Sequence, residues 1–411
     1  MTERIAVPDC MTALINHAGN CLPWETLAAA VSGPFQPVVE SDDAVSVAIG
    51  LLQAFQYDRT VTLVDAGTGL ESEGLDPEAG PAGGEMRSPL TGRADIMTLL
   101  AGPSRGRVRF LTSGTTGPRR QVRHGLKTLL RGVRRHPSLA QAIWGNGYHP
   151  AHMAGVQVLL QGLATGCSVV QLFGLEREQL RQRLLDHRIT HLSATPSFCR
   201  FLLPALMGRE FPDLCRVTLG GEPFDPRLAA TLGEAFPEAR IRNIYASTEA
   251  GSLFIADGDT FRVSNSLEGS VKIEQGELWL SRDLLGDWDG APAWYATGDQ
   301  VEIVDPAPLR FRFLGRALTG INVGGYTVHP EAVEAALCGH PAIAGARVFG
   351  RSQALIGNLL MAELIAEPGV VPPAESAIRK FLSRTCQPFE IPRILRFVDS
   401  LDLTPSGKIR R

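Results

Sequence analysis

Two glycine-containing segments carry residue types that bind phosphate groups and offset negative charge. The first, LTSGTTGPRR at 111–120, follows a short apolar segment that predicts a strand. Small residues let backbone N–H groups approach phosphate oxygens, hydroxyl groups add donors, and the closing arginines add positive charge. The residues concerned are Ser113, Gly114, Thr115, Thr116, Gly117, Arg119 and Arg120. An ordinary strand–helix turn is the alternative, and the missing Lys-Ser/Thr ending argues against a conventional P-loop ATPase.

The second segment, TPSGKIRR at 404–411, reads alone as an exposed turn with a basic end around Lys408. Three further polar motifs lie between the two segments: YASTE at 245–249, YATGD at 295–299 and FLGR at 313–316. Taken singly, Glu249 and Asp299 read as surface carboxylates and Tyr245 as a core aromatic residue. Their order and spacing therefore carry the functional argument.

In this order the motifs resemble those of the adenylate-forming superfamily of acyl- and aryl-CoA synthetases, peptide-synthetase adenylation domains and luciferases. The resemblance covers roughly residues 108–411. It implies ATP-dependent activation of a carboxylic acid as an acyl-adenylate, followed by transfer to a thiol. The attacking carboxylate and ATP are both anions, so such catalysis depends on offsetting charge and on alignment.

The resemblance also implies roles for individual residues. Glu249 would hold Mg²⁺, for which a hard oxygen ligand is suited, and Thr248 would bond the α-phosphate. Asp299 would accept both ribose hydroxyls, and Lys408 would bridge the attacking carboxylate and the phosphate. The remaining nucleotide contacts would come from the phosphate loop (Ser113 to Gly117, with Arg120), Gly220, Gly221, Glu222, Tyr245 and Arg316.

The acyl and thiol sites are expected from two other segments. HPAHMAG at 149–155 resembles the superfamily's P-x-x-H-x-x-G segment, in which His152 would border the carboxylate or gate the thiol tunnel. Gly324 and Gly325 would let a pantetheine arm pass close to the backbone. Amino-acid adenylation domains of the superfamily usually place an Asp near this segment for the substrate ammonium, and this sequence has none there, which argues against an α-amino acid. We expect an aryl or modest-length acyl acid.

Four departures from the superfamily's pattern stand out. The segment before the phosphate loop is shorter than usual, so part of the N-terminal lobe is reduced. An arginine replaces the lysine that closes the phosphate loop, and Arg is a planar fork rather than a point charge. Ala246 replaces a glycine at the acyl-pocket wall, and Leu318 replaces the Asp or Lys of the hinge.

Coenzyme A is the expected thiol, and the phosphopantetheine of an acyl carrier protein is the alternative. A basic run from Arg123 to Arg135, predicted to be helical, would suit an acidic carrier, although a solvated helix face explains it equally. A non-catalytic nucleotide-binding relative is the second alternative. The presence of Glu249, Asp299 and Lys408 together argues against it.

Composition limits the other function classes. The net charge of −3, with 44% hydrophobic and 20% charged residues, gives no reason to expect nucleic acid as a partner. Seven scattered cysteines without a C-x-x-C pair indicate reduced thiols. The N-terminus lacks the pattern of a signal peptide, and the longest apolar stretch, 156–164, is too short and polar to span a bilayer. We therefore expect a cytoplasmic protein without membrane insertion.

Hydrophobic periodicity predicts the elements that position these motifs. Strands alternate with helices through much of 108–245, which favours an α/β fold with a parallel sheet covered by helices. The pattern becomes β-rich from 268 to 313, and a small α+β unit follows. Gly, Pro and acidic residues at 65–107 predict a long surface loop. We expect a large AMP-binding domain at 1–316, shortened before the phosphate loop, and a small mobile C-terminal domain at 317–411.

Overall fold

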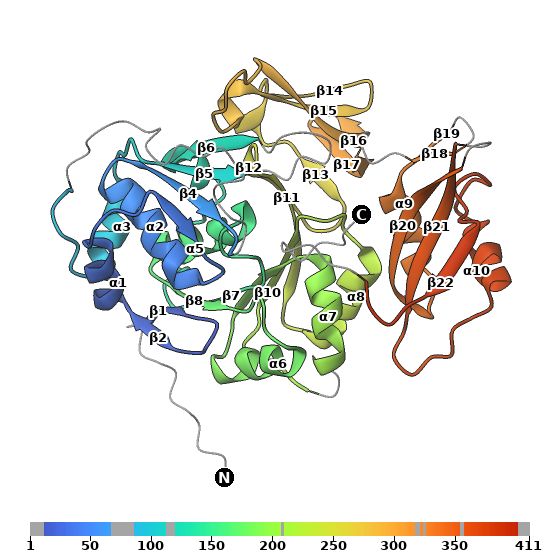
Figure 1. Cartoon of the computed structure of the whole chain (residues 1–411), viewed down its shortest axis with the longest axis horizontal. Coiled ribbons are helices and arrows are strands. Elements are labelled where there is room, and N and C mark those ends of the chain that lie inside the picture. Colours follow the sequence, from blue (N-terminus) through green and yellow to red (C-terminus); the bar gives the residue numbers. More distant parts are fainter. Residues whose placement is uncertain are drawn as a thin grey trace, which may run out of the picture.

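The computed structural model describes residues 12–66, 86–111, 120–206, 209–316, 321–323, 326–353 and 357–401. A large α/β body is followed by a small α+β body, which stands to its side (Figure 1). The predicted phosphate-loop residues Ser113 to Gly117, the hinge at Leu318, Gly324, Gly325 and Lys408 lie outside the described residues.

The largest sheet has eight strands in the order β12-β11-β10-β9-β7-β8-β1-β2. The two edge strands, β12 and β2, run antiparallel to their neighbours, and the strands between them are parallel. The strands are β1 (Thr12–Ile15), β2 (Cys21–Pro23), β7 (Ile143–Asn146), β8 (Ser168–Gln171), β9 (His191–Ala194), β10 (Arg216–Gly220), β11 (Arg240–Ser247) and β12 (Gly251–Ala256). Helices of this part of the chain are α5 (Met153–Thr165), α6 (Arg177–Asp186), α7 (Pro196–Leu206) and α8 (Pro226–Ala235).

A second, four-stranded sheet has the order β3-β4-β5-β6, in which β6 is the antiparallel strand. Its strands are β3 (Val38–Glu40), β4 (Thr60–Val64), β5 (Arg107–Leu111) and β6 (Gln121–Gly125). Its helices are α1 (Trp24–Val31), α2 (Ala44–Gln56), α3 (Arg93–Ala101) and α4 (Leu126–Leu129).

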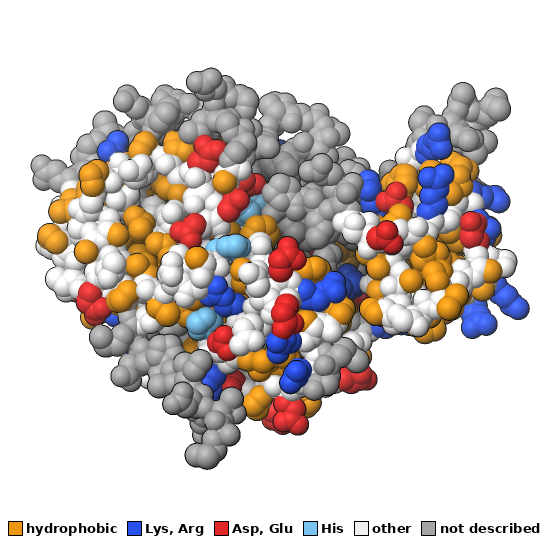
Figure 2. Space-filling view, turned by 60° about the horizontal axis from the view of Figure 1, so that its bottom comes forward, with side chains coloured by type: hydrophobic (Ala, Val, Ile, Leu, Met, Phe, Trp, Pro, Cys, Tyr) orange, Lys and Arg blue, Asp and Glu red, His pale blue; other side chains and the backbone are white. Residues whose placement is uncertain are grey.

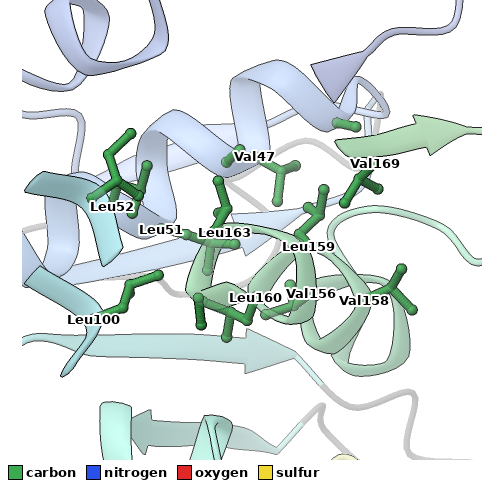
Figure 3. Packing of buried hydrophobic residues seen from close by; sticks show 14 of the residues in the cluster. Val47, Leu51, Leu52, Leu100, Val156, Val158, Leu159, Leu160, Leu163 and Val169 are labelled. Atoms are coloured by element: carbon green, nitrogen blue, oxygen red, sulfur yellow. The ribbon is translucent and has the colours of Figure 1, made fainter. Parts of the chain in front are cut away.

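Helices α2 and α5 join the two sheets into one core. Leu51 of α2 and Leu159 and Leu163 of α5 are buried in the same cluster, and their side chains point toward the space between the helices (Figure 3). Helix α5 is buried on nearly all sides, which explains why its sequence is apolar without a clear helical period. The start of α5 is thereby held rigidly at the junction of the two sheets.

The β-rich segment forms a five-stranded antiparallel sheet in the order β13-β17-β16-β15-β14. Its strands are β13 (Thr260–Arg262), β14 (Val271–Glu274), β15 (Glu277–Ser281), β16 (Trp294–Pro306) and β17 (Leu309–Arg316). In the part of the large body that the structure describes there are also three short 3-10 helices: η2 (Pro137–Leu139), η3 (Asn265–Leu267) and η4 (Arg282–Leu284).

The small body packs its helices on a sheet of order β19-β18-β21-β20, with β22 pairing β21 in parallel. Its elements are β18 (Ile321–Val323), β19 (Tyr326–Val328), α9 (Pro330–Cys338), β20 (Ile343–Gln353), β21 (Gly357–Ala366), α10 (Glu375–Leu382) and β22 (Ile394–Phe397). One contact joins the small body to the end of β17. The carbonyl oxygen of Arg316 lies 3.3 Å from Nδ1 of His329, which directly precedes α9. The domain boundary expected after residue 316 stays a prediction.

The α/β class and the parallel core sheet are confirmed, and two local predictions are wrong. The basic run at 123–135 is not one helix, because Val122 and His124 alternate inward along a strand, β6, before the short α4. The predicted loop at 65–107 contains α3, whose Ile96, Leu99 and Leu100 form a buried stripe. The surrounding Gly, Pro and acidic residues obscured this short helical period.

Candidate active site

The turn between β11 and β12 presents Thr248 and Glu249, and backbone contacts fix it from both sides. The carbonyl of Glu249 accepts a hydrogen bond from the Gly286 N–H at 2.7 Å. The carbonyl of Thr248 lies 2.7 Å from Nε2 of His124. A backbone with φ +68° at Gly251 completes the turn. The Glu249 carboxylate, 16% exposed, is thus held at the carboxyl edge of the parallel sheet, where ligand sites of such sheets commonly lie.

His124 acts in this arrangement as a neutral hydrogen-bond donor. Its side chain is fully buried and packs edge-on against Phe110. Burial lowers the pKa of His124 to about 4, because the charged imidazolium would lose its hydration. Only the tautomer with a proton on Nε2 can donate to the Thr248 carbonyl. Sequence reasoning did not single out His124, although its inward position in the alternating pattern of β6 was a usable signal.

Asp299 lies at the centre of a second, adjoining group. It is 2% exposed, and it faces Arg316 directly in the register of β16 and β17. Nε of Arg316 donates to one carboxylate oxygen of Asp299 at 2.9 Å, and the Tyr245 hydroxyl donates to the other. Burial, together with the negative charge of Asp299, holds the pKa of Tyr245 well above its ordinary value. Tyr245 therefore stays a neutral donor.

The turn before Asp299 explains the Thr-Gly pair in the YATGD motif. Gly298 has φ +76°, a conformation that a residue with a side chain adopts only with strain. Its N–H donates to a carboxylate oxygen of Glu277 at 2.8 Å. The Thr297 hydroxyl donates to the Leu278 carbonyl at 2.8 Å and accepts from the Asp299 N–H at 3.1 Å. These contacts turn Asp299 toward Tyr245 and Arg316.

Arg120 connects the end of the predicted phosphate loop to Glu249. Its Nη1 lies 3.8 Å from a Glu249 carboxylate oxygen and 3.5 Å from the Tyr295 hydroxyl. The guanidinium also lies over the rings of Trp288 and Tyr295, 5.2 and 5.7 Å from their centroids. No motif in the sequence predicted the contribution of Trp288.

The Gly220-Gly221-Glu222 segment ends β10 beside the β7–α5 loop. A Cβ atom on Gly220 would lie 3.2 Å from the Tyr148 hydroxyl, which donates to the Ala194 carbonyl at 2.8 Å and to the Gly220 carbonyl at 3.4 Å. Burial raises the pKa of Tyr148, so the hydroxyl remains protonated. Gly221 has φ +82°, and Glu222 accepts from the Ser197 N–H at 2.8 Å at the start of α7.

His152 directly precedes α5 and contacts Asp65, which follows β4 of the four-stranded sheet. Its Nε2 lies 2.6 Å from the Asp65 carboxylate, and its ring stacks on His149 with centroids 4.3 Å apart. His149 in turn lies 2.8 Å from Asp42. Burial, and the neighbouring His152, lower the pKa of His149 although both carboxylates oppose this. Sequence reasoning found no acid near this segment, but the fold brings Asp42 and Asp65 to it.

Gly155 of the same segment has a steric role. A Cβ atom there would lie 2.1 Å from the carbonyl oxygen of His149, so only glycine lets the loop pack on the first turn of α5. Further along α5, Gln157 accepts a hydrogen bond from the Ser252 hydroxyl at 2.8 Å. The helix is thereby fixed to β12, beside the turn that carries Glu249.

The structure thus brings most of the described predicted site residues to one edge of the large body. Arg120 contacts Glu249, which lies on the same turn as Thr248, and Tyr245 and Arg316 both contact Asp299. His152 is placed with Asp65 and His149 instead. Among the described helices, none is both long and apolar enough to cross a membrane.

Comparison with known proteins agrees with this geometry. Residues 39–280 match the model of the AMP-binding enzymes, and residues 332–408 match the AMP-binding enzyme C-terminal domain. A probable 2-succinylbenzoate–CoA ligase of Mycobacterium tuberculosis is 28% identical over 314 residues, which cover 73% of this chain and 81% of that protein. The 4-hydroxybutyrate–CoA ligase 1 of Metallosphaera sedula is 27% identical over 74% of this chain and 61% of its own length.

Solved structures show the same fold. ATP-bound MatB from Rhodopseudomonas palustris has a TM-score of 0.71 at 16% identity, covering 98% of this chain and 94% of its own. The o-succinylbenzoate CoA synthetase MenE from Bacillus subtilis, in complex with its acyl-adenylate, has a TM-score of 0.63 at 17% identity, covering 97% and 94%. The chain belongs to the AMP-binding enzyme family, that is, to the adenylate-forming ligases.

Proposed function

We propose that this ligase uses ATP to convert an aryl or modest-length acyl acid into its acyl-AMP and then transfers the acyl group to coenzyme A. The observation that carries the proposal is the buried Asp299, whose two carboxylate oxygens are aligned by Tyr245 and Arg316. An anion held in this way is suited to accept two neighbouring hydroxyl groups, because each oxygen has a second lone pair. The ribose of ATP presents such a pair.

Tyr245 and Arg316 would complete the nucleoside site. The Tyr245 ring is 8% exposed and packs against Phe254 and Phe261, with centroids 5.5 and 6.2 Å away. Its exposed edge would meet the adenine. The Arg316 side chain is 55% exposed, so it can contact the ribose while it remains paired with Asp299.

Glu249 would hold Mg²⁺ through a carboxylate oxygen, and phosphate and water would supply the other ligands. The residues present fit this ion, because Glu249 is a largely enclosed but accessible hard oxygen ligand on a turn anchored by Gly286 and His124. The ion would offset phosphate charge. Arg120, 3.8 Å from Glu249, would share that work after exchanging the carboxylate for a phosphate oxygen.

The remaining roles rest on the superfamily resemblance. Ser113 to Gly117 would hold the phosphates, Lys408 would bridge the attacking carboxylate and the α-phosphate, and Gly324 and Gly325 would border the thiol path. His152 lies at the start of α5, where it would border the acid. Asp42 and Asp65 beside it remove the argument against an acid that carries an amino group. An amino-substituted acid therefore belongs in the substrate panel.

Coenzyme A is the first candidate for the acceptor, because the similar proteins of Mycobacterium tuberculosis and Metallosphaera sedula are named as CoA ligases. A carrier protein is the second candidate, because a fatty acid–[acyl-carrier-protein] ligase, ScoC of Streptomyces coeruleorubidus, is 25% identical over 63% of this chain and 56% of its own length. The basic run at 123–135 no longer supports it, since Arg123, Arg131 and Arg135 bond within the chain.

A basic surface on the small body is an observation in favour of the second candidate, the carrier protein. Basic side chains gather on the outer side of the small body (Figure 2). Lys380, Arg384, Arg393 and Arg396, which lie in or next to α10 and β22, are exposed. An acidic carrier protein would be attracted to such a surface.

Pyrophosphate release with Mg-ATP tests the proposal directly. The panel would contain benzoates, aminobenzoates, cinnamates and C4–C16 acids, each with and without coenzyme A. Release stimulated by one acid, and a thioester formed with coenzyme A, would support it. Thioester formed only with a phosphopantetheinylated carrier protein would favour the second candidate. ATP binding without pyrophosphate release across the panel would contradict both.

A further inference from the structure

Two histidines and one aspartate meet where the eight-stranded and four-stranded sheets join, and the nucleotide contacts described above do not use them as a group. Asp65 directly follows β4, and His149 and His152 lie in the loop between β7 and α5. The side chains of Asp65 and His152 are 27% and 33% exposed, whereas His149 is 2% exposed. One side of the group is therefore anchored in the protein and the other is open to solvent.

The ligand atoms of the three residues already converge. One oxygen of Asp65 lies 2.6 Å from Nε2 of His152 and 3.8 Å from Nδ1 of His149. One ligand atom from each residue lies within 4.8 Å of those of the other two. Tetrahedral ligands bound to one metal at about 2.0–2.2 Å lie about 3.3–3.6 Å apart, so side-chain shifts of about 1 Å would suffice to enclose an ion.

The contact between Asp42 and His149 is a second observation that favours a metal site. Nε2 of His149 lies 2.8 Å from Asp42 Oδ1, and the same oxygen accepts from the Ala66 N–H at 2.9 Å. A proton on Nε2, held by a carboxylate, leaves the lone pair on Nδ1, which faces Asp65. Metal-ligating histidines usually donate their second ring N–H to such a carboxylate, because this fixes the tautomer and the ring orientation. The Ala151 N–H donates to Nδ1 at 3.2 Å, and a metal would replace that single contact.

We propose that Asp65, His149 and His152 form a binding site for a divalent transition metal ion of the Zn²⁺ type, with Asp42 orienting His149. Two imidazoles and one carboxylate suit Zn²⁺, Co²⁺ or Fe²⁺ rather than Mg²⁺, which prefers oxygen ligands. Three protein ligands leave a coordination position on the solvent side for water or an anionic ligand. The site is separate from the one proposed at Glu249 and does not depend on the proposed reaction.

Titration of the full-length, chelator-treated protein with Co²⁺ in excess Mg²⁺ tests this site. We expect one Co²⁺ per chain, a visible d–d absorption band that Zn²⁺ abolishes, and a rise in melting temperature with metal concentration. His152→Gln and Asp65→Asn should weaken Co²⁺ binding at least tenfold, and Asp42→Asn by about 10- to 100-fold. Glu249→Gln should leave Co²⁺ binding unchanged, which separates this site from the proposed Mg²⁺ site.

The matched control is His17→Gln, which removes an exposed histidine outside the cluster. Equal Co²⁺ affinity in His152→Gln, Asp65→Asn and His17→Gln would overturn the proposal, as would failure of the unmodified protein to bind Co²⁺ or Zn²⁺. If the variants fold poorly, X-ray absorption of the unmodified Co²⁺ protein decides the question. Two imidazole ligands would support the site, and an all-oxygen shell would overturn it.

Discussion

Asp299 and Arg316 face each other across the antiparallel pair β16–β17, with Arg316 Nε 2.9 Å from an Asp299 oxygen. The backbone register sets this distance, because directly opposed residues of paired strands lie close together. The Tyr245 hydroxyl, from the largest sheet, meets the other carboxylate oxygen. Residues from two sheets are thus pre-positioned around one carboxylate, and this limits the ordering that nucleotide binding must impose.

Replacing Asp299 by Asn should weaken nucleotide binding strongly. The variant keeps the shape of the side chain but loses the charge that Arg316 and the ribose would share. Hydrogen bonds to charged groups are worth roughly 1.5–3 kcal/mol, so we expect a loss of about 10- to 100-fold in ATP affinity by calorimetry. Glu302→Gln, on the same strand but exposed, is the control. Equal affinities in the two variants would refute the ribose role.

Arg120→Ala should slow acyl-adenylate formation. Its guanidinium lies between Glu249 and the rings of Trp288 and Tyr295, so its loss would remove a positive charge from the phosphate side of the site. We expect kcat for pyrophosphate release to fall about 100-fold. Arg120→Lys should recover part of this, because Lys keeps the charge without the planar fork. The exposed Arg105→Ala should behave as wild type; an equal loss there would argue against a specific role.

Lys408→Ala tests the C-terminal motif. A cation that bridges the acid and the α-phosphate offsets charge that develops during adenylation, so its loss should reduce adenylation about 100- to 1,000-fold. ATP affinity should change little. The rate of acid-dependent pyrophosphate exchange is the measurement, and Arg411→Ala is the neighbouring control. Wild-type exchange in Lys408→Ala would rule out the bridging role.

Stability should fall as the pH drops from about 6.5 toward 4. The pKa of His124 is lowered to about 4 in the folded chain, whereas in the unfolded chain it is about 6.5. Below 6.5 the unfolded state therefore binds a proton that the folded state does not. His124 alone should reduce the free energy of unfolding by roughly 3 kcal/mol over this range. Stability from this histidine is fully present above pH 6.5.

His124→Gln keeps an N–H donor for the Thr248 carbonyl and removes the titrating group. Between pH 4.5 and about 6, urea unfolding should therefore show a shallower pH dependence in this variant, by about 1.4 kcal/mol per pH unit. His17→Gln, at an exposed position, serves as the comparison. Parallel pH profiles for wild type and His124→Gln would show that His124 titrates normally in the folded state.

Gly155→Ala and Gly298→Ala should differ sharply in their effect on stability. At Gly298 a Cβ atom would meet nothing within 4 Å, so only the strain of its positive φ remains, about 1 kcal/mol. At Gly155 the Cβ atom would lie 2.1 Å from the His149 carbonyl oxygen, and the loop would have to move. We expect a loss of several kcal/mol there, on the order of a severe core substitution. Equal urea midpoints would contradict this assignment.

Much of the fold could be predicted from the sequence, because the spacing of apolar residues within a single helix or strand indicates the type of that element. The alternation of strands and helices predicted over much of 108–245 corresponds to β7 to β11 with α5 to α8, and the β-rich pattern predicted from 268 to 313 corresponds to β14 to β17. β6 was missed because the charges of its neighbours suggested a helix, whereas the inward alternation of Val122 and His124 decided the structure. Arg123 was misinterpreted for the same reason. It pairs with Asp287 and Asp289 and does not lie on a solvated helix face.

The candidate site was only partly predictable for a different reason. Tyr245, Glu249 and Asp299 stand in motifs, so their types and order carried a signal. Trp288 does not belong to a motif. It lies near Arg120 because the segment before β16 of the five-stranded sheet meets the start of β6 of the four-stranded sheet. Likewise, Asp65 and His152 are 87 residues apart in sequence. Contacts of this kind depend on tertiary packing that a single sequence does not display.

Arg316 engages two parts of the molecule at once. Its side chain bonds Asp299, and its carbonyl oxygen lies 3.3 Å from Nδ1 of His329 at the start of the small body. A ligand that contacts the Arg316 side chain therefore acts on a residue whose backbone also contacts the small body. If a bound nucleotide stabilises one arrangement of the small body, that arrangement must raise the affinity for the nucleotide by the same free energy. We therefore expect ligand occupancy and the placement of the C-terminal body to affect each other through this residue.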